Sequence, residues 1–143
     1  MINSSIGFSE ATNEKVESFM HDLRVGHIQP DLKIMSKLYH ERVCAIEAAS
    51  VYFGREKVME ALTHLLKQMS FESWDWEVVS GDESEDTVWL YVVYRRLKMR
   101  LKDSGQQWEI PESRCTYVLK KTLQGLVIMQ NHASIPAKLS GES

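Results

Sequence analysis

The sequence predicts an α+β domain in which three helices precede a strongly bent antiparallel sheet. Apolar residues recur at helical spacing through most of the first half of the chain. From residue 71 onward the chain consists of long runs rich in valine, tyrosine and other β-forming residues, separated by short polar turns. Because helices and strands are segregated along the chain, we expect the helices to pack together on the concave side of one sheet.

Length and composition fit a single domain, which we place at residues 9–137 with flexible tails at 1–8 and 138–143. The 143 residues are 43% hydrophobic and 26% charged, with a net charge of −3, so no strong field would attract nucleic acid. No apolar run reaches the roughly 18 residues of a membrane span, and Met1–Gly7 lacks the features of a signal peptide. We therefore expect a cytoplasmic protein with no nucleic-acid or membrane partner.

No residue spacing in the chain suggests a metal or a cofactor. Cys44 and Cys115 are far apart and lie in apolar, strand-like runs, which predicts buried free thiols. The remaining histidines, apart from one discussed below, lack the spacing of metal ligands. Function is therefore expected to reside in a site made of ordinary side chains.

The first two helices are predicted by their starting residues. Ser9 can cap a helix that ends near Gly26, and Pro30-Asp31 suits the start of a short second helix. Leu32 and Met35 are expected on the buried side of the second helix. The apolar residues of the first helix are spaced at three and four positions: Val16, Phe19, Met20 and Leu23.

A third helix and the strands follow. Two short strand-like runs between Tyr39 and Phe53 surround Glu47, and Gly54-Arg55 then begins a helix. Its apolar stripe is the most regular in the chain: Val58, Ala61, Leu62, Leu65, Leu66 and Met69. Four long strands complete the sequence, over Phe71–Val79, Thr87–Lys102, Gln107–Lys121 and Gly125–Pro136.

The last two strands form a hairpin on which the predicted site depends. If residues 122–124 are its loop, Lys121 pairs with Gly125. Opposed residues lie roughly 5 Å apart at Cα, so this register gathers a polar quartet of Glu112, Arg114, His132 and Ser134. A loop one residue longer or shorter would turn one strand over and separate the quartet.

The two faces of the predicted sheet differ in composition. A loop at residues 103–105 would place Tyr94 opposite Arg114, and the even-numbered face would then be apolar with a few polar groups, as in a ligand pocket. Three helices can cover only one face. We therefore expect a small-molecule ligand on the even face and a homodimer through the other, which carries Trp89, Tyr91, Tyr117, Val127 and Met129.

Two residues are candidates for acid or base catalysis. His132 titrates near neutral pH when unperturbed and would lie across from Arg114. Its alternative role is that of a structural hydrogen-bond partner beside Ser134. Glu47 lies among apolar neighbours, where burial would raise its pKa.

The predicted ligand-binding residues also have structural alternatives. Arg114 can bind an anionic group of the ligand or form an ion pair with Glu112. Tyr94 can donate to a carbonyl oxygen or serve as an aromatic wall. The set of predicted ligand-binding residues is completed by polar residues of the same face: Glu112, Thr116, Gln130 and Ser134.

Several short motifs accompany this order of elements: Tyr39–Val43, Phe53–Glu56, Glu112–Arg114 with Thr116, and Asn131–Pro136. Together they resemble the nuclear transport factor 2-like superfamily, which includes ketosteroid isomerases, scytalone dehydratase and SnoaL-like polyketide cyclases. The resemblance implies a cone-shaped, curved antiparallel (mixed) sheet with three helices on its concave face, a small and mostly apolar ligand, and frequent homodimers. Two positions depart from the family's pattern: Glu41-Arg42 replaces a carboxylate-rich turn, and Leu126 stands where a tryptophan is usual.

Two functional hypotheses follow. The first is a SnoaL-like pocket protein, acting on or binding a small apolar or carboxylate-bearing ligand, with proton-transfer chemistry such as isomerisation, cyclisation or dehydration. The second is a non-catalytic association module that resembles the kinase association domain, in which the sheet face forms the dimer. An open cavity favours the first hypothesis, and a cone filled by side chains favours the second.

Overall fold

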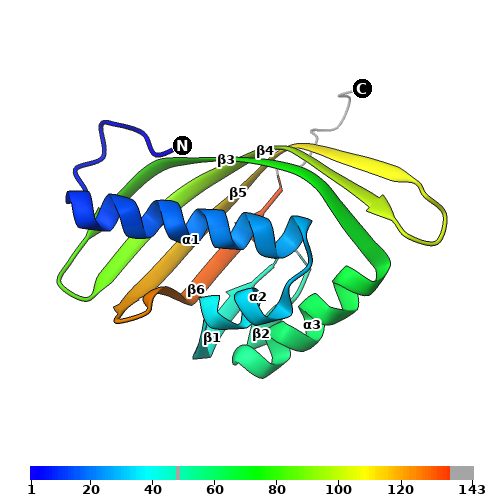
Figure 1. The fold of residues 1–143 in the computed structure, drawn as a ribbon, viewed down its shortest axis with the longest axis horizontal. Coiled ribbons are helices and arrows are strands. Elements are labelled where there is room, and N and C mark those ends of the chain that lie inside the picture. The colour runs from blue at the N-terminus through cyan, green and yellow to red at the C-terminus, as the bar shows by residue number, and fades with distance from the viewer. Residues whose placement is uncertain (48, 136–143) are drawn as a thin grey trace.

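Helices and strands follow one another in the predicted order (Figure 1). The structure, a computed structural model, describes residues 1–47 and 49–135, and the predicted tail at 138–143 lies outside them. None of the described helices is long and apolar enough to span a membrane. The elements are α1 (Glu10–Ile28), α2 (Leu32–Leu38), β1 (Tyr39–Ile46), β2 (Val51–Phe53), α3 (Arg55–Gln68), β3 (Met69–Glu83), β4 (Thr87–Leu101), β5 (Gln107–Thr122) and β6 (Gly125–Ser134).

The first two helices begin where the sequence predicts. The hydroxyl of Ser9 accepts a hydrogen bond from the backbone N–H of Thr12 at 3.2 Å. α1 continues past Gly26 to Ile28, with its predicted apolar stripe buried. Asp31 caps α2, where Met35 is buried but Leu32 is 39% exposed, so the prediction for Leu32 was wrong.

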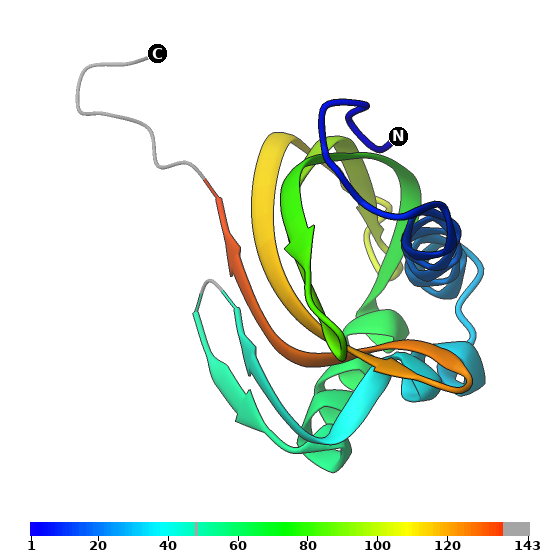
Figure 2. The same cartoon turned by 90° about the vertical axis from the view of Figure 1, so that its left-hand side faces the viewer.

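The six strands form one curved, open sheet of order β2-β1-β6-β5-β4-β3. β1 pairs with β6 in parallel, and the other pairs are antiparallel. Figure 2 shows the sheet curling round with the three helices on its concave side. This confirms the predicted fold class, including its mixed sheet. The core between the layers contains fully buried residues from both: Val16, Met20, Leu23, Met35, Val43, Val78, Val88, Leu90, Val92, Leu119 and Ile128.

The first three residues add a short pairing to the edge of the sheet. The N–H of Val78 donates to the carbonyl of Met1 at 2.9 Å, and the N–H of Asn3 donates to the carbonyl of Val78 at 3.0 Å. Ile2 thereby forms a parallel bridge with β3. Segment 1–8, expected to be loose, is held here by β3 and by Phe8 in the core.

The β5–β6 register differs from the prediction. Thr122 pairs with Gly125, so the loop has two residues. The hydroxyl of Thr122 donates to the Gly125 carbonyl at 2.8 Å and accepts from the Gln124 N–H at 3.2 Å. A register shift between Val118 and Leu119 then places Arg114 opposite Ser134 rather than His132. The predicted pairing of Lys121 with Gly125 was therefore wrong.

The β4–β5 register differs from the prediction by one residue, and the loop covers residues 102–106 instead of 103–105. Its backbone is shaped by local hydrogen bonds, from the Ser104 N–H to Asp103 and from the Gln106 N–H to the Ser104 hydroxyl, and by Gly105 at a φ of 73°. Tyr94 consequently lies opposite Ser113 instead of Arg114. This turns β5 over, because strand side chains alternate between faces.

The prediction of an even-numbered pocket face is thus right for β4 and wrong for most of the hairpin. Val88, Leu90, Val92 and Tyr94 are buried on the concave face, together with odd-numbered residues of β5. The polar residues predicted beside them are exposed on the convex face: Glu112, Thr116, Gln130, His132 and Ser134. The quartet therefore does not form.

Gly81 of β3 lies where a larger residue would collide with its neighbours. A Cβ atom at this position would lie 2.6 Å from the carbonyl oxygen of Trp89 and 2.7 Å from the ring of Phe8. Because a backbone oxygen cannot move aside cheaply, Gly81→Ala is expected to lower the free energy of unfolding by about 1–3 kcal/mol. Urea denaturation measures this. Gly7→Ala is the control, since nothing lies within 4 Å of its added methyl group, and equal stabilities of both variants would contradict the prediction.

Candidate functional site

The concave side of the sheet encloses a cavity of about 400 Å³. One part of its wall is apolar: Leu23, Ala45, Val58, Ala61, Leu62 and Leu65. The other part is polar or aromatic: His27, Tyr39, Glu47, Tyr52, His64, Gln68, Trp74, Tyr117 and Asn131. An apolar chamber with a few converging polar groups is the usual form of a small-molecule site.

The apolar stripe of α3 forms one wall of this cavity. Val58 and Leu66 are buried, whereas Ala61, Leu62 and Leu65 are only half-buried. These three half-buried residues line the cavity, which explains why they are not fully buried. The most regular apolar stripe in the sequence is therefore only partly used for packing.

Glu47 lies at the end of β1, beside the cavity. Its backbone N–H donates to the carbonyl of Ser50 at 2.8 Å, and its carboxylate accepts a hydrogen bond from Nδ2 of Asn131 at 3.2 Å. Burial of the carboxyl group raises its pKa, while Asn131 and His132 lower it to a smaller extent. The residue remains accessible, as a proton donor or acceptor for a ligand must.

Asn131 reaches the concave face because of the irregularity in β6. Ile128 is buried before the register shift, and Asn131, an odd-numbered residue, is buried after it with an exposed fraction of 5%. Its Nδ2 is used by Glu47, but its Oδ1 has no hydrogen-bond partner. This buried oxygen is an acceptor at the cavity wall.

His27 and Trp74 form the aromatic end of the cavity. Nδ1 of His27 lies 2.8 Å from the carbonyl of Leu23, so this nitrogen carries the proton and Nε2 can act only as an acceptor. Burial lowers the pKa of His27 to about 4, which keeps the ring neutral near pH 7. Its ring contacts that of Trp74 edge-on, with centroids 4.6 Å apart. Trp74 is 7% exposed, and its Nε1 has no partner.

A smaller chamber of about 160 Å³ adjoins the cavity and shares His27, Trp74 and Tyr117 with it. The hydroxyl groups of Tyr94 and Tyr117 lie 2.6 Å apart, and burial raises the pKa of both phenols. Both side chains are therefore neutral donors and acceptors at physiological pH.

Of the two predicted catalytic residues, Glu47 lines the cavity and His132 does not. Tyr94 and Arg114 line the smaller chamber, and Nε of Arg114 is buried without a partner. Glu112 pairs with Arg95 at 3.9 Å rather than with Arg114. The other predicted ligand-binding residues, Thr116, Gln130 and Ser134, are exposed on the convex face.

Sequence reasoning missed Asn131, Trp74 and His27 as cavity residues. For His27 a signal exists, because it follows Leu23 by one helical turn and so continues the apolar stripe of α1. Asn131 has no such signal, since its orientation depends on an irregularity in β6. In the described part of the chain, no cluster of three or more His, Cys, Asp or Glu residues is arranged to hold a metal.

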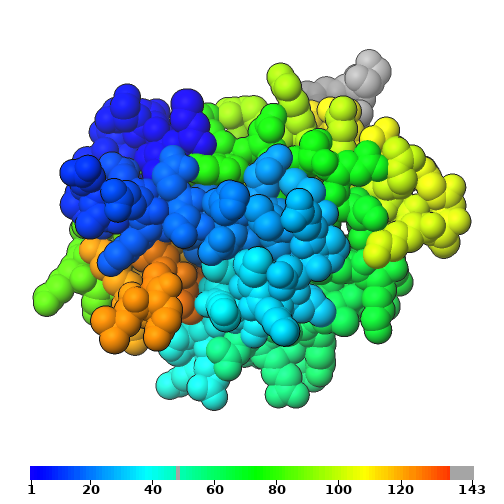
Figure 3. Space-filling view, viewed as in Figure 1, coloured from blue at the N-terminus to red at the C-terminus, as the bar shows by residue number. Residues whose placement is uncertain are grey.

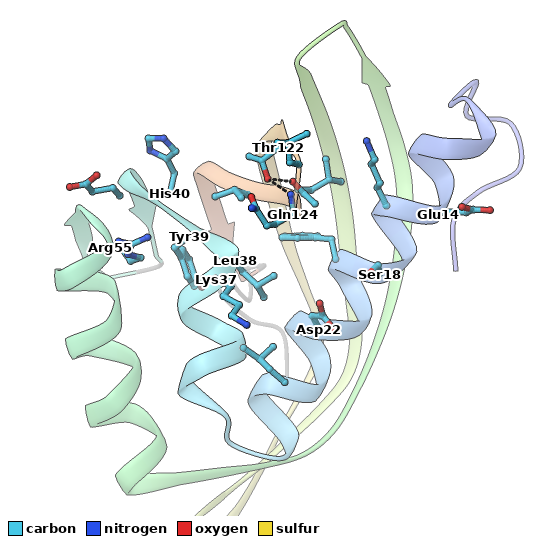
Figure 4. Close-up of a pocket in the computed structure, with 18 of the residues that line it drawn as sticks. Glu14, Ser18, Asp22, Lys37, Leu38, Tyr39, His40, Arg55, Thr122 and Gln124 are labelled. Atoms are coloured by element: carbon cyan, nitrogen blue, oxygen red, sulfur yellow. Dashed lines mark hydrogen bonds between the residues drawn. The ribbon is translucent and has the colours of Figure 1, made fainter.

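A wider hollow of about 1040 Å³ lies between α1, α2 and the β5–β6 turn. Figure 3 shows these three segments meeting at the surface, and Figure 4 shows charged side chains around the hollow, among them Glu14, Asp22, Lys37 and Arg55. In the described part of the chain, the buried polar side-chain atoms without a partner belong to Trp74, Arg114 and Asn131, none of which lines this hollow. We therefore take the smaller, more apolar cavity beside Glu47 as the candidate site.

Known proteins share this architecture. A ketosteroid isomerase-like protein from Erwinia carotovora atroseptica superposes with a TM-score of 0.77 at 13% identity, covering 92% of this chain and 100% of that one. A nuclear transport factor 2-like superfamily protein from Salmonella enterica gives a TM-score of 0.73 at 17% identity, covering 93% and 99%. At these identities the similarity shows the fold alone.

An NTF2-like protein from Cytophaga hutchinsonii gives a TM-score of 0.73 at 12% identity and covers 90% of this chain and 100% of its own. No curated protein matches the sequence. The family model of the SnoaL-like domain matches residues 16–138, which is most of the chain. The cone-shaped fold, the order of its elements and this match agree with the resemblance found in the sequence, and the chain belongs to the SnoaL-like domain family.

Proposed function

We propose that this protein binds a small, largely apolar molecule in the concave cavity and that Glu47 exchanges a proton with it. The observation that carries the proposal is a carboxyl group with a raised pKa at the wall of an apolar cavity of about 400 Å³. A carboxyl group with a raised pKa suits general acid–base chemistry, which works best when the pKa of the group lies close to the working pH.

The chemistry supported by this arrangement is proton transfer at carbon or oxygen. Isomerisation, cyclisation and dehydration each require a group that removes a proton from one atom of the substrate and delivers one to another. Glu47 can do both, and Asn131 holds its carboxyl group in place. The neutral phenols of Tyr94 and Tyr117 lie farther into the sheet, where they can donate to an oxygen of the ligand.

Binding can be tested with tetralone, a bicyclic ketone of suitable size, by isothermal titration calorimetry. Ala61→Trp should abolish binding, because a large ring on α3 would fill the cavity. Ala11→Trp is the matched control, since Ala11 lies on α1 at the wider hollow instead. Loss of binding only in Ala11→Trp, or in neither variant, would contradict the assignment of the cavity.

The association module is the alternative function. It would leave the cone without a ligand, and the open cavity favours the pocket protein instead. The two functions share a homodimer through the convex face, which stays a prediction. Four of the five residues named for it lie on that face: Trp89, which is 41% exposed, and the half-buried Tyr91, Val127 and Met129. Tyr117 does not belong to it, because β5 is turned over and places Tyr117 in the core.

We expect Val127→Glu to convert a dimer into a monomer, because a charge would be buried at the centre of an apolar contact. Light scattering on a sizing column measures the mass. Leu123→Glu makes the same chemical change at the fully exposed tip of the β5–β6 turn and should leave the dimer intact. A wild-type protein that elutes as a monomer at micromolar concentration would refute the dimer.

A further inference from the structure

The wider hollow between α1, α2 and the β5–β6 turn is separate from the candidate site. Of the residues that line it, only Tyr39 also lines the cavity beside Glu47. Its volume of about 1040 Å³ lies at the upper limit of the roughly 300–1,000 Å³ typical of small-molecule pockets. Along α1 the hollow extends from Ala11 to Asp22, about 16 Å, which an extended chain spans with about five residues. The size therefore suits a short peptide segment.

Charged side chains of the hollow stand on two facing walls. Asp22 of α1 is half-buried, and Lys37 of α2 lies across the gap between the two helices (Figure 4). Acids outnumber bases on the α1 wall and bases outnumber acids on the opposite wall, whose members are in turn Glu14, Asp22 and Lys15, and Lys37, Arg55 and Glu41. Among the described residues none of these six forms an ion pair. An occupant with a cation towards α1 and an anion towards the opposite wall would therefore be complementary to both.

The hollow also presents apolar side chains at its sides. Ile34 of α2 is half-buried, and Leu123 is fully exposed at the tip of the β5–β6 turn. Two-residue hairpin loops usually contain glycine, asparagine or aspartate, so Leu123 is an apolar residue at a position where a polar one is common. Covering Ile34 and Leu123 with apolar side chains of an occupant would stabilise a complex.

Groups for binding a peptide backbone are present as well. An extended segment has N–H and C=O groups along its length that need partners. Ser18 of α1 and Gln124 of the turn lie at the hollow (Figure 4), and a hydroxyl or a carboxamide can both donate and accept hydrogen bonds. A peptide lying between them would be bound from two sides.

We propose that this hollow binds an extended peptide segment of about five residues from another protein. Apolar side chains of the segment contact Ile34 and Leu123, a lysine or arginine of the segment pairs with Asp22, and an aspartate or glutamate pairs with Lys37. The segment is thus apolar at its centre and carries one charge of each sign. The site is independent of the proposed function, because it lies outside the cavity beside Glu47.

The test uses blocked pentapeptides, acetylated and amidated so that their ends carry no charge. All have leucine, serine and leucine at the centre, and their outer residues are lysine and glutamate, lysine and glutamine, glutamine and glutamate, or two glutamines. Each unequal pair is made in both orders, since the hollow does not determine the direction of the chain. Calorimetry should show that the peptide with both charges binds about three- to tenfold more tightly than the one with two glutamines, as expected for two partly exposed ion pairs.

Two variants identify the charged partners. Asp22→Asn should remove the advantage that lysine gives a peptide, and Lys37→Gln should remove the advantage that glutamate gives. Glu17→Gln on α1 and Lys33→Gln on α2 are the matched controls, because both residues are exposed on the same helices and do not line the hollow. Both controls should preserve the wild-type order of affinities.

Filling each cavity separately distinguishes the two sites. Ala11→Trp should abolish peptide binding and leave tetralone binding intact, whereas Ala61→Trp should do the reverse. Since Asp22→Asn and Lys37→Gln keep the size of the side chain, their result stands even where Ala11→Trp fails to fold.

Three results would overturn the inference. They are equal affinities for all the peptides, no binding of any peptide at millimolar concentration, and loss of peptide binding in Ala61→Trp instead of Ala11→Trp. None of them bears on the proposed function, which is tested with tetralone. Conversely, a protein that binds the peptides but not tetralone would retain this inference and lose the proposed function.

Discussion

Glu47→Gln is expected to slow proton exchange in a bound ketone by about 10²–10⁴-fold, the range typical of a lost general base. Glutamine keeps the size of the side chain and the hydrogen bond with Asn131 but cannot take a proton. The measurement is deuterium incorporation from D₂O at the carbon next to the carbonyl of tetralone, followed by NMR. Glu41→Gln, on the exposed side of β1, is the control and should exchange at the wild-type rate.

Glu47→Gln should also change how the stability of the protein depends on pH. Because the pKa of Glu47 is raised in the folded protein, the folded state binds its proton more tightly than the unfolded state does. Wild-type stability therefore declines as the pH rises from the unfolded carboxyl pKa, about 4.3, through the raised folded value. Glu47→Gln lacks this loss and should be as stable as the wild type, or more stable, at pH 7. A variant that exchanges at the wild-type rate, or that unfolds at neutral pH, would contradict the role given to Glu47.

His27 is expected to make the protein lose stability as the pH falls. Its pKa is about 4 in the folded state and about 6.5 when unperturbed, so between these values the unfolded chain binds a proton that the folded chain does not. Stability is fully present above pH 6.5 and falls as the pH is lowered toward 4, by up to about 3 kcal/mol. Urea unfolding followed across this range measures the effect.

His27→Phe should flatten this part of the stability curve, because phenylalanine keeps the ring contacts with Phe71 and Trp74 and does not titrate. His21→Phe, a replacement at an exposed position of the same helix, should leave the slope unchanged. Carboxylates with lowered pKa, such as Glu83, act mainly below this window and are common to all three proteins. A His27→Phe variant with the wild-type slope would show that His27 is not buried as a neutral ring.

Local patterns in the sequence were sufficient to predict the helices and the order in which helices and strands follow along the chain. The caps at Ser9 and Asp31 and the apolar stripe of α1 are determined by neighbouring residues. The curved sheet with helices on one side then follows, because its apolar face must be covered. Glu47 was identified from its apolar neighbours in the chain, which predicted burial, although the structure leaves the residue exposed at the cavity.

The registers of the two long hairpins were not predictable from strand composition. Each depends on hydrogen bonds made by one turn side chain, Thr122 in one turn and Ser104 in the other. A shift of one residue in the β4–β5 register turned β5 over, so that Glu112 and Thr116 lie on the convex face, and the irregularity in β6 placed Asn131 inside the cavity and His132 outside it. The predicted polar quartet does not form because both hairpin registers differ from the prediction.

The most direct test of a ligand site beside Glu47 is an NMR titration of the ¹⁵N-labelled protein with tetralone. The indole N–H resonance of Trp74, assigned from Trp74→Phe, should shift together with the Asn131 side-chain amide and the backbone amides of Ala45 and Glu47. Shifts confined to α2 and the β5–β6 turn, or to Trp89 and Val127 on the convex face, would place the ligand elsewhere and contradict it.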